Sequence, residues 1–274
     1  MISMILQKNK SQDGIAFHKS GKGDPIILIH GLGLSAECWY KQISFLKKDY
    51  TVYALDLPGH GKSDLLSQAK PQLKNYSNKI INFIKDKKII KPILIGHSLG
   101  ALITIQIAGQ SPKLLKSGIA VSPIFNRSKL ALKKVQVRAK ELELNTDKKN
   151  IAKEPLKRWF GSSKTKIALD NYKFVERLIK NNKRSFNYKG YSIGYKAFSE
   201  IKGNTNEVIK KIKCPMMFIT GEKDQNSSPL MSKKLARFHN SKVLIIKNAR
   251  HALFLTHFNQ FNFHLNQFIK GLEY

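Results

Sequence analysis

Residues 93–109 read ILIGHSLGALITIQIAG, an apolar run that passes through a serine between two glycines into a helical pattern. The branched residues before Gly96 are typical of a buried strand, and those after Gly100 repeat with the spacing of a helix. Ser98 therefore stands where a strand changes into a helix. So sharp a turn crowds the serine backbone, and glycines relieve the crowding because they have no Cβ. The stretch predicts a nucleophile elbow that lifts the Ser98 hydroxyl clear of the backbone.

The alternation of apolar runs and helical patterns extends along most of the chain. Six continuous apolar runs are typical of strands buried on both faces, at residues 25–30, 51–57, 91–97, 117–123, 214–220 and 242–248. Helical patterns lie at about 36–48, 68–87, 99–110, 228–239 and 256–270. This order predicts an α/β fold with a mostly parallel, doubly wound sheet that helices cover on both faces.

One long segment between the fourth and fifth of these runs has no strand pattern. Residues 126–200 contain only polar and basic helical patterns, so we predict a helical lid inserted there, with the core domain formed by residues 1–125 and 201–274. The lid segment holds 20 Lys and Arg against 7 Asp and Glu. An excess of this sign favours an anionic partner.

Composition narrows the class of protein. The chain has 274 residues, of which 42% are hydrophobic, enough for one sizeable core. Its formal net charge is +31, but the lysines are spread along the chain without an arginine-rich block, an RNP-type aromatic motif or a zinc-finger spacing. A general lysine bias of the surface therefore explains the charge better than a specific nucleic-acid site.

The cysteines and the hydropathy pattern predict a reduced, soluble protein. Cys38 and Cys214 are the only cysteines, and neither has the spacing of a disulfide framework or a metal site. No run approaches the ~18 apolar residues of a membrane span, and the first residues carry only a short apolar patch. We expect a cytoplasmic protein without a membrane span.

A serine hydroxyl needs a base within hydrogen-bond reach and a carboxylate that orients the base. Candidates should follow later strands, because the carboxyl ends of parallel strands meet at one edge of the sheet. Asp224 comes shortly after the run at 214–220, and His251 follows the run at 242–248. Ser98, Asp224 and His251 have the chain order of this architecture, so we predict them as nucleophile, acid and base.

Two rivals compete for these roles. Glu222 is the rival acid, but the short turn through Gly221 carries Asp224 further beyond the strand end. His257 is the rival base, but it falls where the next helix should begin. We therefore prefer Asp224 and His251.

Acyl transfer also requires donors directed at the developing oxyanion. The helix that begins at Leu99 provides one backbone N–H. The sequence HGLG at 30–33 follows a strand that ends at the same edge, and the N–H of Leu32 is the best placed there. We predict these two N–H groups as the oxyanion hole.

Five motifs together resemble the α/β-hydrolase superfamily in its lidded esterase and lactonase branch. They are LIHGLG (28–33), DLPGHGKSD (56–64), GHSLG (96–100), ITGEKD (219–224) and ARHALF (249–254). The resemblance assigns the same triad and oxyanion residues as the chemistry above, and it implies no metal and no organic cofactor. A serine at the elbow separates the chain from the dehalogenases and epoxide hydrolases of the superfamily, which use aspartate there.

Shorter motifs point to two branches of that superfamily. HGLGLSAECW (30–39) and HALFLTHF (251–258) resemble pimeloyl-acyl-carrier-protein methyl ester esterases, although Thr256 and Phe258 depart from the usual glutamate and proline. RWF (158–160) and GYSIGYKAF (190–198) resemble 3-oxoadipate enol-lactonases.

These resemblances imply a carboxylic ester hydrolase. Its expected partner is a small-molecule ester or lactone, or an acyl group on an acidic acyl-carrier protein. The alternatives are a lactone hydrolase, a non-catalytic receptor on the same fold and a polyanion-binding protein.

Four further residues are candidates for the substrate pocket. His30 and His97 lie in turns at the catalytic edge, where they either line the pocket or stabilise the loops. Trp159 and Phe160 lie in the lid segment, where they either contact substrate or form the core of the lid.

Overall fold

A single eight-stranded sheet runs through the centre of the protein. The computed structural model describes residues 6–68, 70–144, 152–161, 165–184, 187–238 and 241–272. The strands are β1 (Asn9–Lys10), β2 (Ala16–Ser20), β3 (Pro25–Ile29), β4 (Thr51–Leu55), β5 (Ile93–His97), β6 (Ser117–Val121), β7 (Met216–Gly221) and β8 (Lys242–Ile246). Their order is β1-β2-β4-β3-β5-β6-β7-β8, and the strands from β4 to β8 are parallel to one another.

The six predicted strands form the parallel part of the sheet, so the predicted α/β class and mostly parallel sheet are confirmed. Sequence reasoning missed β1 and β2, which add an antiparallel edge. β2 reads AFHKS, and its last three residues are partly exposed, so it lacks the continuous apolar signal of the central strands.

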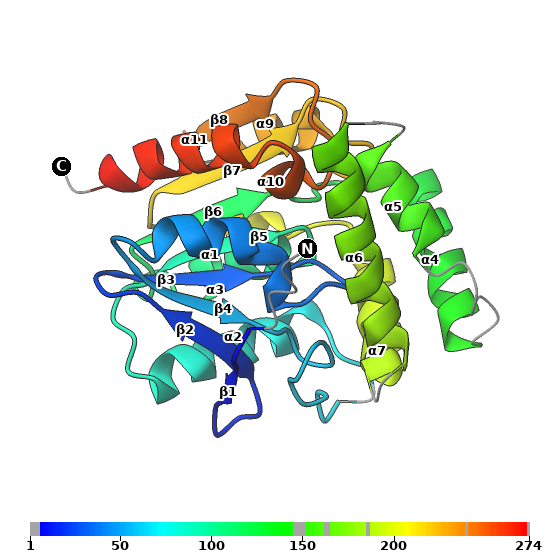
Figure 1. Ribbon diagram of the computed structural model, residues 1–274, viewed down its shortest axis with the longest axis horizontal. Helices are drawn as coiled ribbons and strands as arrows, with labels where there is room; N and C mark the ends of the chain where they lie inside the picture. Colours follow the sequence, from blue (N-terminus) through cyan, green and yellow to red (C-terminus); the bar gives the residue numbers. More distant parts are fainter. Residues whose placement is uncertain are drawn as a thin grey trace.

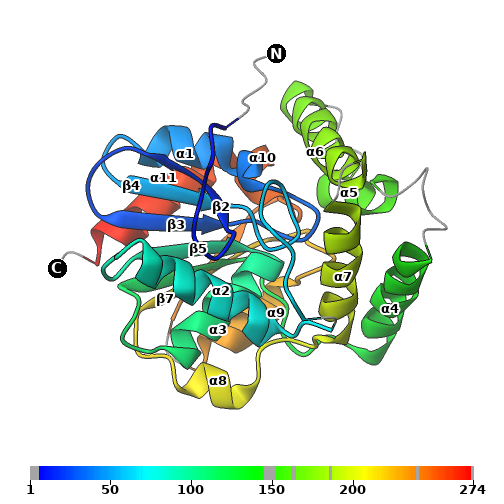
Figure 2. The same cartoon turned by 90° about the horizontal axis from the view of Figure 1, so that it is seen from below.

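Helices cover both faces of the sheet, as expected for a doubly wound fold. In Figure 2, α2 (Leu73–Asp86), α3 (Leu99–Gln110) and α9 (Pro229–Ala236) lie on one face, and α1 (Tyr40–Leu46) and α11 (Phe258–Lys270) lie on the other. α3 is buried along nearly its whole length and is apolar on every side, as a helix enclosed by its neighbours must be. A short α8 (Asn206–Lys210), not predicted, precedes β7.

The last predicted helix is interrupted. The sequence pattern predicted one helix over 256–270, but the structure has α10 (Leu253–Thr256) and then α11. His257 separates them because its φ of −120° and ψ of 37° are not helical. The short 3₁₀ turn η1 (Ala36–Trp39) divides the predicted helix at 36–48 in a similar way.

Between β6 and α8, the described residues form α4 (Lys129–Glu143), α5 (Lys153–Phe160), α6 (Lys166–Arg184) and α7 (Asn187–Glu200). They stand together beside one end of the sheet (Figure 1). The loops that follow the parallel strands lie at that end. Tyr191 of α7 packs edge-on against His60, which follows β4, and Trp159 of α5 packs edge-on against His97, the last residue of β5. That this insertion acts as a separate lid domain over 126–200 stays a prediction.

A buried ion cluster connects the N-terminal segment to the loops that follow β3 and β4. The Lys8 ammonium lies 2.7 Å from Asp56 and 2.7 Å from Glu37, and the Lys8 and Asp56 side chains are 3% and 0% exposed. Asp56 also accepts hydrogen bonds from the backbone N–H groups of Ala36 (2.8 Å) and Lys62 (2.9 Å). One carboxylate therefore holds the loops after β3 and β4 together.

We expect Lys8→Met to lower the free energy of unfolding by about 3 kcal/mol, because it leaves the Asp56 charge buried without its partner. Lys10→Met is the matched control, since the Lys10–Asp64 pair is exposed (49% and 62%) and should contribute less than about 1 kcal/mol. Urea unfolding of both variants measures the difference. Equal losses would show that the buried cluster does not stabilise this end of the chain.

Candidate active site

The serine between the two glycines adopts a strained backbone. β5 ends at His97, α3 begins at Leu99, and Ser98 between them has a φ of 54° and a ψ of −109°. A positive φ is costly for a residue with a Cβ, and such strained residues cluster at functional sites. The Ser98 N–H donates to the carbonyl oxygen of Val121 at 2.9 Å, so the next strand holds the turn in place.

The two flanking glycines are required by contacts with backbone atoms. A Cβ on Gly96 would lie 2.1 Å from the carbonyl oxygen of Gly100, and a Cβ on Gly100 would lie 2.3 Å from the carbonyl oxygen of Ile29. Backbone atoms in a sheet and a helix cannot move aside as a flexible side chain can. The G-x-S-x-G spacing is thus a direct consequence of how closely α3 approaches β5 and β3 at this turn.

Asp224 and His251 form a buried pair. His251 Nδ1 lies 2.8 Å from Asp224 Oδ2, and their side chains are 1% and 0% exposed. The other carboxylate oxygen accepts from the N–H groups of Asn226 (2.8 Å) and Ser227 (3.0 Å). Burial alone would raise the pKa of the Asp224 carboxyl, but His251 and these N–H groups outweigh it and hold that pKa below its usual value.

An ionised Asp224 fixes the tautomer of His251. Because the carboxylate only accepts, Nδ1 carries the proton and Nε2 is left as the free acceptor. Within the described part of the chain, Nε2 is buried and has no hydrogen-bond partner. A general base requires a nitrogen in this state.

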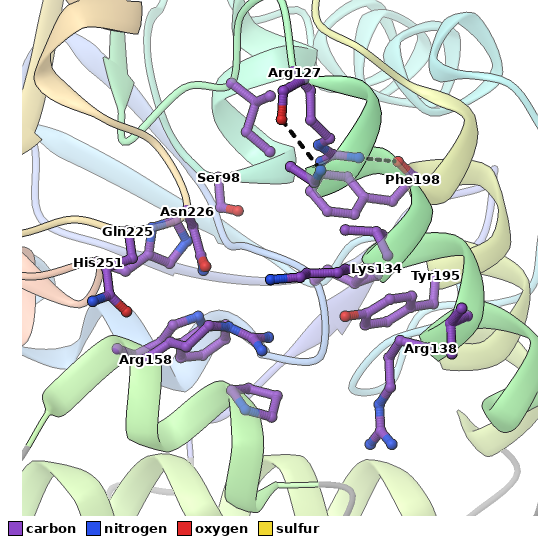
Figure 3. A pocket seen from close by; sticks show the side chains of 18 of the residues that line it. Ser98, Arg127, Lys134, Arg138, Arg158, Tyr195, Phe198, Gln225, Asn226 and His251 are labelled. Carbon is purple, nitrogen blue, oxygen red and sulfur yellow. Dashed lines mark hydrogen bonds between the residues drawn. The ribbon is translucent and has the colours of Figure 1, made fainter.

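Ser98 and His251 line the same cavity, which has a volume of about 700 Å³ (Figure 3). The structure thus brings the predicted nucleophile and base to one site and places Asp224 on the far side of the His251 ring from Nε2. The rivals lie elsewhere: Glu222 accepts from the N–H of Asn248 at 2.8 Å. His257 lies between α10 and α11, with its Nδ1 2.9 Å from the Thr256 hydroxyl.

The two predicted oxyanion residues flank the serine. Leu99 is the first residue of α3, where a backbone N–H has no acceptor within the helix. The turn with Leu32 lies against the elbow, since a Cβ built on Gly31 would be 3.2 Å from Ser98 Cβ. Leu32 also lines the cavity. Their role as the oxyanion hole stays a prediction.

His30 and His97, predicted for the pocket, are fully buried and bonded to backbone groups. His30 Nδ1 donates to the carbonyl oxygen of Gly31 at 2.7 Å, and its Nε2 accepts from Leu57 N–H at 2.9 Å. His97 Nε2 donates to the carbonyl oxygen of His251 at 3.1 Å. Burial lowers the pKa of both rings. His30 connects two loops, and His97 supports the loop that carries His251.

The two predicted aromatic residues differ in position. Trp159 lines the cavity, and its ring lies 5.5 Å from the His251 ring at an angle of 40°. Phe160 is buried and packs edge-on against Tyr172 of α6 at 5.9 Å. Trp159 thus connects the insertion to His251, while Phe160 packs between α5 and α6.

The charge excess of the insertion favours an anionic partner, and the lining of the cavity is basic. The lining contains Arg127, Lys134, Arg138 and Arg158 (Figure 3). Two features of the sequence indicate this basic lining. The insertion carries an excess of positive charge, and the four-residue spacing of Lys134 and Arg138 places both on one face of α4.

Two classes of feature are not found among the described residues. No helix there combines the length and the apolar character needed to cross a membrane. No cluster of three or more His, Cys, Asp or Glu in the same ranges is placed to hold a metal ion.

A family model for the alpha/beta hydrolase fold matches residues 24–258, and the chain belongs to this family. It is 34% identical to the (E)-2-((N-methylformamido)methylene)succinate hydrolase of Acinetobacter baylyi, over 93% of this chain and 94% of that protein. It is 32% identical to a pimeloyl-[acyl-carrier protein] methyl ester esterase of Wigglesworthia glossinidia brevipalpis, over 85% and 88%. The enol-lactonase of Burkholderia xenovorans LB400 shares the fold, with a TM-score of 0.79 at 19% identity over 96% of this chain and all of that one.

We expect Asp224→Asn to reduce ester turnover by about 10²- to 10⁴-fold, because an amide no longer selects the Nδ1–H tautomer of His251. Glu222→Gln is the matched control, since it also replaces a carboxylate by an amide, two residues away in the same turn. Its rate of ester turnover should stay close to that of the unmodified protein. Initial rates on a p-nitrophenyl ester compare the two. A greater loss for Glu222→Gln would transfer the acid role to Glu222.

Proposed function

We propose that this protein is a serine hydrolase that cleaves a carboxylic ester through an acyl-enzyme on Ser98. One observation carries the proposal: the buried Asp224–His251 pair leaves Nε2 free beside the cavity that Ser98 also lines. The strained backbone of Ser98 supports it, because strained residues of this kind cluster at active sites.

The reaction follows from these positions. Nε2 of His251 takes the Ser98 hydroxyl proton as Oγ bonds to the substrate carbonyl carbon, and the carbonyl electron pair moves onto oxygen. The N–H groups of Leu32 and Leu99 stabilise this oxyanion. The intermediate collapses and expels the alcohol, which takes the proton from His251. Water then attacks the acyl-enzyme with the same base, and the acid leaves with Ser98 restored.

Two relatives suggest the kind of substrate. One is named for a methyl ester of a pimeloyl group on an acyl-carrier protein, and the other for a substituted succinate. A carrier-linked methyl ester is therefore one candidate. A small carboxylate-bearing substrate, including a lactone of the 3-oxoadipate enol-lactone type, is the second, and the basic lining of the cavity favours it. A receptor without catalysis would bind such compounds but not turn them over.

Ser98→Ala tests the proposal, because it removes only the hydroxyl oxygen. We expect ester turnover to fall by about 10³- to 10⁶-fold, with the circular dichroism spectrum and the unfolding midpoint unchanged. The assay measures p-nitrophenolate release from a short-chain ester. A variant that keeps near-normal rates would show that Ser98 is not the nucleophile, and an unmodified protein inactive on a broad ester panel would favour the receptor.

A further inference from the structure

The charges that line the cavity do not balance one another. Glu141 is the carboxylate among the lining residues, and it pairs with Arg138 at 3.1 Å. Arg127 donates to the carbonyl oxygen of Phe198 at 3.1 Å and lies 4.4 Å above its ring. Two cationic side chains of the lining remain, Lys134 of α4 and Arg158 of α5. Within the described ranges, neither is paired with a carboxylate.

These two cations face the same space as a buried tyrosine. Figure 3 shows the Lys134 amine and the Arg158 guanidinium directed into the middle of the cavity, and the Tyr195 hydroxyl pointing toward them, whereas the Arg138 guanidinium extends away. The three side chains come from α4, α5 and α7, so different helices of the insertion converge on this point. Ser98 and His251 line the same cavity.

Tyr195 completes a group of donors. Burial raises the pKa of its phenol despite the nearby Arg158, so the hydroxyl keeps its proton at neutral pH. Arg158 lies close enough to Tyr195 for its charge to act against this rise of the phenol pKa. A protonated phenol can donate its O–H to an acceptor in the cavity. Lys134, Arg158 and Tyr195 thus offer donors, and their complement is an anionic acceptor.

We propose that Arg158, Lys134 and Tyr195 form a carboxylate-binding site in the cavity, so that the substrate carries a carboxylate on its acyl or alcohol part in addition to the bond that Ser98 attacks. A planar guanidinium matches a carboxylate with two parallel hydrogen bonds, and pairing with an anion offsets the desolvation of the partly buried Arg158. This inference rests on the proposed function, because it places the bound substrate against Ser98.

Matched pairs of esters test the site. p-Nitrophenyl hemiglutarate carries a carboxylate on the acyl part, and p-nitrophenyl hexanoate is its neutral counterpart; 4-acetoxybutanoate and pentyl acetate form the pair for the alcohol part. We expect the unmodified protein to prefer the anionic member of at least one pair. Arg158→Gln should lower kcat/KM for that ester by about 10- to 100-fold, and for the neutral member by less than about threefold.

Two smaller changes and one control refine the result. Tyr195→Phe and Lys134→Gln should each lower kcat/KM for the anionic ester by about 3- to 10-fold, and the Lys134 effect should shrink at high salt. Lys133→Gln is the control, since Lys133 is the neighbouring exposed lysine of α4 and is not part of the lining. Equal losses on both members of a pair, a preference for the neutral esters, or an equal effect of Lys133→Gln would overturn the proposal.

A binding measurement separates this site from the nucleophile assignment. Glutarate should bind to Ser98→Ala protein in calorimetry, and about 10-fold more weakly when Arg158→Gln is added. Should Ser98→Ala retain turnover while Arg158 still discriminates the charged ester, the proposed nucleophile fails and the carboxylate site stands. If Ser98→Ala abolishes turnover but Arg158→Gln leaves the affinity for glutarate unchanged, the proposed carboxylate site is wrong and the serine hydrolase proposal is supported.

Discussion

The close approach of α3 to β5 and β3 at Ser98 is the constraint on which the site depends. Gly96 and Gly100 have no room for a Cβ because each would meet a backbone oxygen at 2.1–2.3 Å. Between these two glycines, Ser98 adopts a left-handed backbone conformation at the carboxyl end of the central parallel strands. The strain is maintained because the sheet on one side and the largely buried α3 on the other determine the turn.

The elements around this turn hold His251 in place. Asp224 follows β7 and His251 follows β8, and their 2.8 Å contact gives the imidazole its orientation and tautomer. His97, next to the serine in sequence, bonds to the backbone of His251, and Trp159 from the insertion packs on the His251 ring. His251 is therefore held from the sheet and from the inserted helices at the same time.

The parallel core, the contact of Asp224 with His251 and the shared cavity of Ser98 and His251 agree with the sequence, because each leaves a strong local signal. Strands buried on both faces read as continuous apolar runs, and parallel strands bring the residues after them to one edge. β2 was missed because only its first two residues are buried. The predicted pocket role of His30 rested on its place at that edge, whereas its two ring nitrogens are engaged by Gly31 and Leu57, a loop contact that only the fold reveals. Lys133 and Lys134 are indistinguishable in sequence, yet only Lys134 lines the cavity.

The central claim is that the strained serine is a nucleophile activated by its neighbours, and covalent trapping tests it most directly. Incubation of the folded protein with a fluorophosphonate, followed by peptide mass spectrometry, should give one adduct per chain on the peptide that contains Ser98. The adduct should form much more slowly in His251→Ala protein, because the hydroxyl then has no base. A chain that hydrolyses esters but carries the adduct on another residue, or carries none, would contradict the account.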